Sequence, residues 1–450
     1  MTVDAPSREI AGLLIASRLW AERQPVDDER VRAARANLLL ANHARYAATI
    51  PVYRQLLTDL RLDDVADIPA LAADLLISVD LFKSYDEAWL ADGNFAAMTR
   101  WVSEVSTHAP DPDLQGVRTV AEWRNRLRGE GIYLGISSGS SGRLSFVPRD
   151  RATAAALATN GRSYSPLMWG GYASAEPDYD LLLLTPPGRA LGMQAVATGL
   201  AAQATRSHTL IPPDPNEEPA RDSGAALTAT LDFLRAGAAT GRRLLIYGGP
   251  PAVAWFCTQA HERGEDVALP PDTLLVTGGG WKGARADDPA SSSPAALGEL
   301  IGRSLGITAE RWVDVYGMSE CNAYLLRCQS GRYHVPPVLE MFVVDDDLTP
   351  LSGPDVTGTI ALLDPFAFSY PGFLLTGDRG RLVTAPCPCG LAGPGFLDGI
   401  TRAPQQELKG CAGAALSALP LSALPLSALP LSTPPSSALP LSTPPSSTLP

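Results

Sequence analysis

Apolar residues recur at helical spacing over the first quarter of the chain. Over residues 10–20 and 31–50 they return every three or four positions, which predicts amphipathic helices. Asp27, Asp28 and Glu29 precede the second stretch, where negative charge favours a helix N-terminus. Short segments at 67–70 and 81–83 connect such stretches, and we expect their apolar side chains to pack. Residues 1–125 are therefore predicted to form a helical N-terminal subdomain.

From residue 126 the pattern changes to strands alternating with helices. Continuous apolar runs at 180–185, 243–247 and 273–277 each lead into Gly or Pro, as buried strands do. Shorter β-prone segments flank a Gly/Ser loop at 132–134 and 144–147, and an alanine-rich helix is expected at 152–158. The prediction is an α/β core over residues 126–398, with mostly parallel sheets flanked by helices and ligand loops at the carboxyl ends of the strands.

The pattern ends in low complexity. A Leu-Ser-Ala-Leu-Pro repeat with variants runs from residue 416 to 450 and contains neither charge nor aromatic side chain. Proline at every fifth position forbids regular helix, so residues 414–450 are predicted to be a disordered tail without a functional module. Residues 399–413 are left as a hinge and a short C-terminal arm.

Composition narrows the functional classes. The 450 residues, 45% of them hydrophobic, can build two or three domains around a large core. A net charge of −12 without a basic patch disfavours nucleic acid and anionic membranes as partners. No apolar run is long enough for a membrane span, and Asp4, Arg8 and Glu9 stand where a signal peptide would differ, so a cytoplasmic location is expected. The six cysteines are too few for a disulfide framework and suggest reduced thiols, metal ligands or a nucleophile.

The loop at 135–143 (GISSGSSGR) is the strongest local signal for chemistry. Interleaved glycines and hydroxyl residues let a polyanion approach the backbone and offer it N–H and O–H donors, so a phosphate chain is the natural ligand. A Gly/Ser linker is the alternative, although the flanking strands and the following helix count against it. The loop lacks the Gly-Lys-Ser/Thr ending of a Walker loop and the glycine spacing of a Rossmann turn.

A second stretch, VDVYGMSE at 313–320, presents an acid after a strand. The strand ends at an aromatic residue and turns at Gly317. Tyr316 could stack on a base, and Glu320 could hold Mg²⁺ against phosphate oxygens. A plain turn with a solvated glutamate is the alternative.

These motifs together resemble the adenylate-forming superfamily. SSGSSG at 137–142, YGMSE at 316–320 and TGD at 376–378 occur in its order, and within it the chain is most similar to the LuxE-type acyl-protein synthetases and the related phenylacetate-CoA ligases. Further matches are IPVYR at 50–54, LFK at 81–83, TGGGWK at 277–282, GRYHVPP at 331–337, CPCG at 387–390 and KGC at 409–411. Each motif is weak alone, but their shared order over residues 30–412 is specific.

The resemblance implies a role for each matching residue. It implies that the loop closes on ATP phosphates, that Tyr316 packs near the adenine, that Glu320 ligates magnesium and that Asp378 takes the ribose hydroxyls. Arg402 stands where a hinge arginine is expected, although GITR replaces the family's tighter GR. The residues implied to bind ATP are Ser137, Ser138, Gly139, Ser140, Ser141, Gly142, Gly278, Gly279, Tyr316, Gly317, Met318, Ser319, Asp378 and Arg402, with Trp281 in the substrate pocket.

Two departures from the superfamily pattern matter. Many members carry a lysine three residues after the last glycine of the loop, whereas this chain has Ser145, as in the acyl-protein branch. The superfamily's mobile C-terminal domain with its catalytic lysine is expected to be absent, because only a short arm follows the hinge.

The cysteines raise two separate questions. Cys328, His334, Cys387 and Cys389 resemble a structural zinc site of related ligases, and four N/S ligands suit tetrahedral Zn²⁺. Buried thiols and a hydrogen-bonded histidine are the alternative. In acyl-protein synthetases a cysteine near the C-terminus accepts the acyl group, which implies that role for Cys411, with a bystander thiol as the alternative.

The resulting functional prediction is an ATP-dependent acid–thiol ligase. A carboxylic acid, fatty or aryl, would be activated to acyl-AMP with Mg²⁺ and ATP, and its acyl group passed as a thioester to Cys411 and onward to an acyl reductase. An acyl-CoA ligase that uses coenzyme A is the first alternative. A catalytically silent nucleotide-binding scaffold is the alternative of another class.

Overall fold

The N-terminal region is helical, as the apolar spacing predicts. The computed structural model describes residues 5–62, 65, 67–137, 143–168, 178–185, 192–210, 223–264, 269–279 and 294–402. Asp27 caps the second helix by accepting a hydrogen bond from the Arg30 amide, and Asp67 caps the fourth in the same way from Ala70. The helices here are α1 (Ala5–Ala21), α2 (Asp28–Thr49), α3 (Pro51–Leu60), α4 (Ile68–Asp74), α5 (Glu87–Ala91), α6 (Phe95–Val105) and α7 (Val120–Gly129), with a 3₁₀ turn at Val79–Lys83.

The three predicted buried strands and the strand predicted to end at Tyr316 form the parallel half of one large sheet, together with a strand at Arg206–Thr209 that the sequence pattern did not predict. In order across the sheet they are β8 (Trp312–Tyr316), β7 (Leu274–Gly278), β6 (Arg243–Gly248), β4 (Tyr179–Leu184) and β5 (Arg206–Thr209), and every adjacent pair is parallel. The connecting helices are α10 (Gly192–Ala201), α11 (Ser223–Thr240), α12 (Pro250–Glu262) and α13 (Pro294–Leu305). The predicted α/β fold with parallel strands is confirmed.

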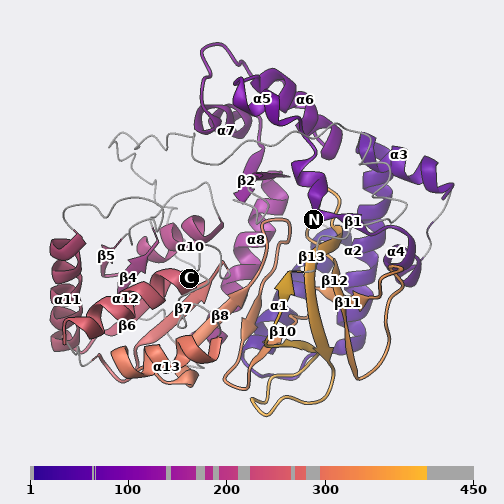
Figure 1. The fold of residues 1–450 in the computed structure, drawn as a ribbon. Coiled ribbons are helices and arrows are strands. Elements are labelled where there is room, and N and C mark those ends of the chain that lie inside the picture. Colours follow the sequence, from indigo (N-terminus) through magenta and orange to yellow (C-terminus); the bar gives the residue numbers. More distant parts are fainter. Residues whose placement is uncertain are drawn as a thin grey trace, which may run out of the picture.

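Helices cover both faces of this parallel half (Figure 1). Successive strand residues point to opposite sides, so Leu182 and Ile246 pack with α11, α12 and α13, whereas Leu181 and Leu245 pack with α10 and the end of α1. The central strands β4, β6 and β7 are therefore apolar over most of their length, which explains the continuous runs in the sequence, whereas the edge strand β5 (RSHT) is polar.

The same sheet continues as an antiparallel half. Its strands are β9 (Leu325–Arg327), β10 (Arg332–His334), β14 (Gly395–Leu397), β13 (Phe373–Val383), β12 (Asp355–Leu363) and β11 (Glu340–Val344). Strand β13 also pairs with the short strands β1 (Ile77–Ser78) and β15 (Thr401–Arg402). The sheet is thus mixed, and its antiparallel half packs against the N-terminal helices in the largest core.

A separate two-stranded hairpin carries the Gly/Ser loop. Strands β2 (Tyr133–Ser137) and β3 (Ser145–Arg149) pair antiparallel, and α8 (Arg151–Ser163) and the short α9 (Ser165–Met168) follow. All five residues of β3 are buried, so the hairpin is anchored in the core although it is no part of the large sheet. Among the described helices, none combines the length and the hydrophobicity needed to cross a bilayer.

Candidate functional site

The base of the Gly/Ser loop is described, although the loop itself is not. Ser137 ends β2 and pairs in register with Ser145, the first residue of β3. Ser138, Gly139, Ser140, Ser141 and Gly142 lie outside the described residues, so their phosphate-binding role stays a prediction. The hairpin nevertheless fixes where the loop starts and ends.

Glu320 lies directly against this base. The Ser145 hydroxyl donates a hydrogen bond to Glu320 Oε1 at 2.5 Å, and the glutamate is only 6% exposed. In the part of the chain that the structure describes, no Lys, Arg or His forms an ion pair with this carboxylate. A buried carboxylate without a cationic partner is costly, so the donor set fits a bound cation such as Mg²⁺. The alternative of a solvated glutamate does not agree with this burial.

Tyr316 and Asp378 also meet, from β8 and β13. The Tyr316 hydroxyl donates to Asp378 Oδ2 at 2.8 Å, and the Arg402 guanidinium lies 3.2 Å from Asp378 Oδ1. Burial, together with the Asp378 charge, raises the pKa of Tyr316 well above its ordinary value, which keeps the phenol protonated as a donor. Asp378 and Arg402 are register partners of β13 and β15, so the sheet itself places this pair.

The glycines expected near the nucleotide lie at the carboxyl ends of β7 and β8. Gly278 pairs with Val315, and a Cβ at Gly278 would lie 3.3 Å from the Val315 Cβ. Gly279 has φ +82°, which disfavours a side chain. Gly317 leaves room for Tyr324, since a Cβ there would lie 3.2 Å from the Tyr324 Cβ.

The remaining predicted site residues divide between described and undescribed parts. Met318 packs partly buried against the main core, and the Ser319 carbonyl accepts a hydrogen bond from Arg149. Trp281 and Cys411 lie outside the described residues. The structure therefore places Ser137 and Glu320 beside Ser145 in one group. Tyr316, Asp378 and Arg402 form a second group.

Four residues with metal-binding atoms converge beside β9 and β10. One ligand atom from each of Cys328, His334, Cys387 and Cys389 lies within 4.8 Å of the other three. The Cys389 thiol lies 3.3 Å from His334 Nε2, and the Cys328 and Cys387 sulfurs are 3.7 Å apart. They come from the β9–β10 hairpin and from the loop before β14, which pairs with β10.

The donor set of this cluster fits Zn²⁺. His334 is fully buried, its Nδ1 has no hydrogen-bond partner among the described residues, and burial with nearby Arg332 and Arg23 lowers its pKa to about 4. A neutral imidazole with three thiols is a common structural zinc set. Burial opposes ionisation of Cys387, but hydrogen bonds from Cys389 and Cys328 outweigh it and lower its pKa, which favours a thiolate there. Burial raises the pKa of Cys389 to about 12, so this thiol would lose its proton only on binding a metal.

A buried polar network behind Glu320 was not predicted from the sequence. Arg149 Nε donates to Asn322 Oδ1 at 2.8 Å, and the Asn322 backbone and side-chain amides donate to Asp364 Oδ2 at 2.6 and 2.9 Å. Burial raises the pKa of Asp364, against the effect of these donors. Its only sequence signal is an arginine at the end of a short β-prone segment, because the partners of Arg149 are 170 or more positions away.

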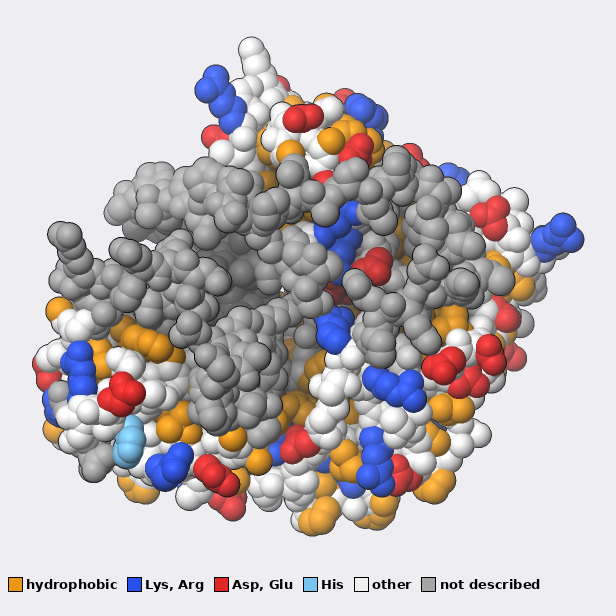
Figure 2. Space-filling view, viewed as in Figure 1, with side chains coloured by type: hydrophobic (Ala, Val, Ile, Leu, Met, Phe, Trp, Pro, Cys, Tyr) orange, Lys and Arg blue, Asp and Glu red, His pale blue; other side chains and the backbone are white. Residues whose placement is uncertain are grey.

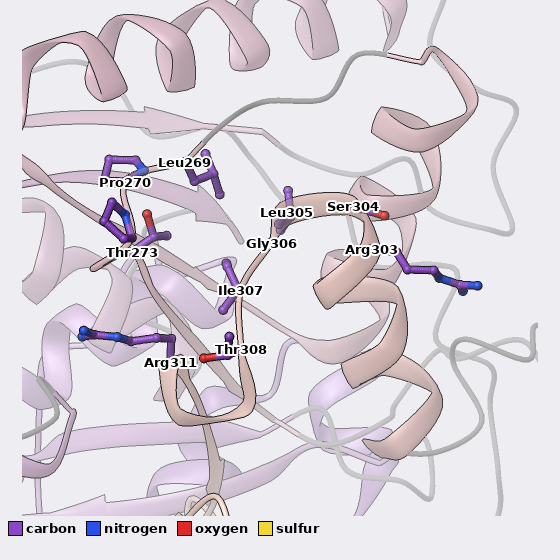
Figure 3. A pocket seen from close by; sticks show the side chains of 11 residues that line it. Leu269, Pro270, Thr273, Arg303, Ser304, Leu305, Gly306, Ile307, Thr308 and Arg311 are labelled. Atoms are coloured by element: carbon purple, nitrogen blue, oxygen red, sulfur yellow. The ribbon is translucent and has the colours of Figure 1, made fainter.

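A cavity of about 340 Å³ lies at the opposite end of the parallel strands (Figure 3). It is lined by the end of α13 and the residues before β7, including Thr273, Ser304 and Ile307. The side chains of Arg303 and Arg311 extend in opposite directions in Figure 3. Because the carboxyl ends of parallel strands carry the ligand loops in such sheets, we do not place the site here.

Charged side chains of both signs lie on the face shown in Figure 2. On the face shown in Figure 2, acidic and basic side chains of the described residues are interspersed, without a broad basic patch.

Comparison with known proteins gives the family. A family model described as "Acyl-protein synthetase, LuxE" matches residues 136–419, from the loop hairpin onward. The chain belongs to the LuxE acyl-protein synthetase family. It is 25% identical over 170 residues to the long-chain-fatty-acid--luciferin-component ligase of Aliivibrio fischeri, and the aligned region covers 36% of this chain and 43% of that protein. The corresponding Vibrio harveyi ligase is 25% identical over 154 residues, covering 34% and 40%. The matched part thus spans less than half the length of these curated relatives.

Solved structures support the same fold. An open conformation of 2-hydroxyisobutyryl-CoA ligase, solved with 2-HIB-AMP and CoA, superposes with a TM-score of 0.53 at 16% identity, covering 84% of this chain and 75% of that chain. Its thioesterification-state structure also gives a TM-score of 0.53, covering 85% and 70%. At this identity the likeness shows that the LuxE-family chain has the fold of an adenylate-forming ligase.

Proposed function

We propose that this protein activates a carboxylic acid with ATP to give acyl-AMP. A carboxylate oxygen attacks the α-phosphorus, a new P–O bond forms, and the bond to the leaving pyrophosphate breaks. The observation that carries the proposal is the position of Glu320, a buried carboxylate without a described cationic partner at the base of the Gly/Ser loop. Bound Mg²⁺ would neutralise charge on the phosphates, and Glu320 is the residue that would hold it.

The second group of residues suits the nucleoside end of ATP. Asp378 can accept hydrogen bonds from both ribose hydroxyls, and the Tyr316 hydroxyl holds its carboxylate at 2.8 Å. Gly278 and Gly279, at the carboxyl end of β7, would let the nucleotide approach the backbone closely. The loop at 137–142 would supply N–H and O–H donors to the phosphates.

For the second half-reaction we propose transfer of the acyl group to a protein thiol. The Cys411 thiolate, formed by loss of its proton to solvent, would attack the acyl carbonyl, AMP would leave, and the acyl group would then pass from the thioester to an acyl reductase. Family membership supports this route, whereas the solved neighbours contain CoA, which makes coenzyme A the alternative acceptor. Long-chain fatty acids are the substrates named for the two curated relatives, and aryl acids remain the alternative.

Pyrophosphate exchange tests the first half-reaction. The purified protein, ATP, Mg²⁺ and a panel of fatty and aryl acids should give acid-dependent incorporation of labelled pyrophosphate into ATP. Absence of exchange with every acid would favour the nucleotide-binding scaffold. The acceptor is tested with labelled acid: a hydroxylamine-sensitive acyl-protein band that Cys411→Ser loses supports the protein thiol, and a product seen only with coenzyme A supports the ligase alternative.

A further inference from the structure

We infer that Arg149 and Tyr370 are positioning residues that hold the backbone around Glu320, and so set the magnesium dependence of ATP binding. Three consecutive carbonyls carry the argument. Arg149 Nη2 donates to the carbonyls of Ser319 and Cys321, the latter at 3.3 Å, and the Tyr370 hydroxyl donates to the carbonyl of Glu320 itself at 3.1 Å. The inference rests on the proposed role of Glu320.

The hydrogen bonds from Arg149 and Tyr370 to these three carbonyls, here called the carbonyl clamp, connect the Glu320 segment to β3 and to the loop between β12 and β13. Arg149 ends β3, four positions after Ser145, whose hydroxyl bonds the Glu320 side chain. Both residues lie on the same face of the strand, because side chains alternate along it. Strand β3 therefore contacts the Glu320 side chain through Ser145 at its first residue, and the backbone on either side of Glu320 through Arg149 at its last residue.

On the other side of the carbonyl clamp, Tyr370 and Asp364 lie in the loop between β12 and β13. Asn322 Nδ2 donates to the Tyr370 oxygen at 2.8 Å, and both Asn322 amides donate to Asp364, which follows β12. Asn322 Oδ1 accepts a hydrogen bond from Arg149, so the Asn322 side chain connects Arg149 on β3 with Tyr370 and Asp364 in the loop. Because β13 carries Asp378, this network also fixes the Glu320 segment relative to that carboxylate.

Burial makes the arrangement rigid. Arg149 is 6% exposed, and Asn322, Asp364 and Tyr370 are fully buried. Hydrogen bonds in such an environment cannot be exchanged for water without cost, so the carbonyls stay where the donors hold them. A metal ligand must be placed to within a fraction of an ångström, which a backbone held at three successive carbonyls supplies.

Tyr370→Phe is the sharpest test. It removes the hydroxyl while it keeps the ring, which packs edge-on against Phe82 with centroids 5.4 Å apart and lies under the Arg149 guanidinium. Tyr179→Phe is the matched control, because the buried Tyr179 hydroxyl also donates to a carbonyl, that of Leu200 at 2.7 Å, in the parallel half. Both variants lose one buried hydroxyl, but only one of these contacts Glu320.

ATP affinity is measured by calorimetry with Mg²⁺ and again in EDTA, beside magnesium activation of pyrophosphate exchange. For Tyr370→Phe we expect the gain in ATP affinity from Mg²⁺ to fall about tenfold, with affinity in EDTA unchanged. The Tyr179→Phe variant should keep the wild-type gain. If Tyr370→Phe does not fold, Arg149→Lys replaces it, since one ammonium cannot reach both carbonyls and Asn322.

The outcomes separate the two levels of the argument. Wild-type protein without exchange for any acid and without a magnesium effect on ATP binding overturns the proposed function and this inference with it. Active wild-type protein whose Tyr370→Phe variant keeps the full magnesium effect overturns the inference alone. An equal loss in Tyr179→Phe would assign the effect to general destabilisation, and the positioning role would be wrong.

Discussion

Replacing Glu320 by glutamine should stabilise the protein while it removes the activity. The amide oxygen of the glutamine still accepts the Ser145 hydrogen bond, so the change removes mainly a charge. At 6% exposure and without a described ion-pair partner, that charge lacks the hydration and the pairing that would offset its burial. Its neutralisation should raise the free energy of unfolding by roughly 1–2 kcal/mol in the absence of metal.

The effect on catalysis should have the opposite sign. Loss of the proposed metal ligand removes stabilisation of the phosphate charge, and we expect acid-dependent exchange to fall about 100-fold or more, equivalent to at least ~2.7 kcal/mol. Thermal melts in EDTA measure the stability, melts with Mg²⁺ and ATP measure ligand stabilisation, and exchange measures the activity. The glutamine variant should melt higher than wild type in EDTA and gain less from Mg²⁺ with ATP.

A matched surface change provides the control. Glu340 is partly exposed and forms an ion pair with Arg35, so Glu340→Gln should lose up to about 1 kcal/mol of stability and leave exchange unchanged. A lower melting temperature for Glu320→Gln in EDTA would show that the carboxylate has a stabilising partner and would refute the electrostatic argument. Near wild-type exchange would refute the metal role.

Three further predictions address other contacts. Ser145→Ala leaves the buried Glu320 carboxylate without its described donor and should lower the free energy of unfolding by roughly 1.5–3 kcal/mol. Ser17→Ala is the control and should lower it little, because the buried Ser17 hydroxyl has no partner among the described residues. Urea unfolding of the two variants measures the difference. Cys389→Ser should lose the zinc that elemental analysis is expected to find near one equivalent and should lower the melting temperature, and a chelator should then have no further effect; wild-type protein without zinc would remove the site. Burial opposes ionisation of Asp180, but hydrogen bonds from Arg206 and Arg242 outweigh it and lower the pKa of Asp180 below 3.8. The ionised carboxylate therefore stabilises the folded protein above pH 3.8, and this contribution is lost as the pH falls through the lower pKa of the folded state. Asp180→Asn should therefore destabilise by roughly 2 kcal/mol at neutral pH and by less at about pH 3, and an equal loss at both pH values in thermal melts would contradict the assignment.

The sequence predicted those parts of the fold that leave a local pattern. Apolar runs bounded by glycine or proline marked β4, β6 and β7, because strands buried on both faces are apolar throughout. The acid at the end of the YGMSE stretch was found from its local context; the structure buries it beside Ser145, and its role as a metal ligand stays a prediction. Residues 138–142, Trp281 and Cys411 keep their predicted roles without a structural test.

The antiparallel half and the carbonyl clamp could not be read from local pattern. Short strands such as β9 and β10 have three residues each, too few to show a period. The clamp depends on pairs such as Arg149 with Asn322, which are 173 positions apart, and each member alone is an ordinary polar residue. Long-range pairing of this kind has no signature within a sequence window.

The weak attachment of β15 has a consequence for dynamics. Only two register pairs, at Asp378 and Arg379, join it to β13, and the Arg402 side chain in its ion pair is half exposed, whereas β12 and β13 pair over nearly their whole length. Peeling this two-residue strand away breaks few contacts and leaves the core intact. Amide hydrogens of residues 401 and 402 should therefore exchange with deuterium long before those of β12, and each such opening frees one oxygen of Asp378. The rate at which β15 detaches from β13 would then set how often the Asp378 carboxylate is free to meet a new partner.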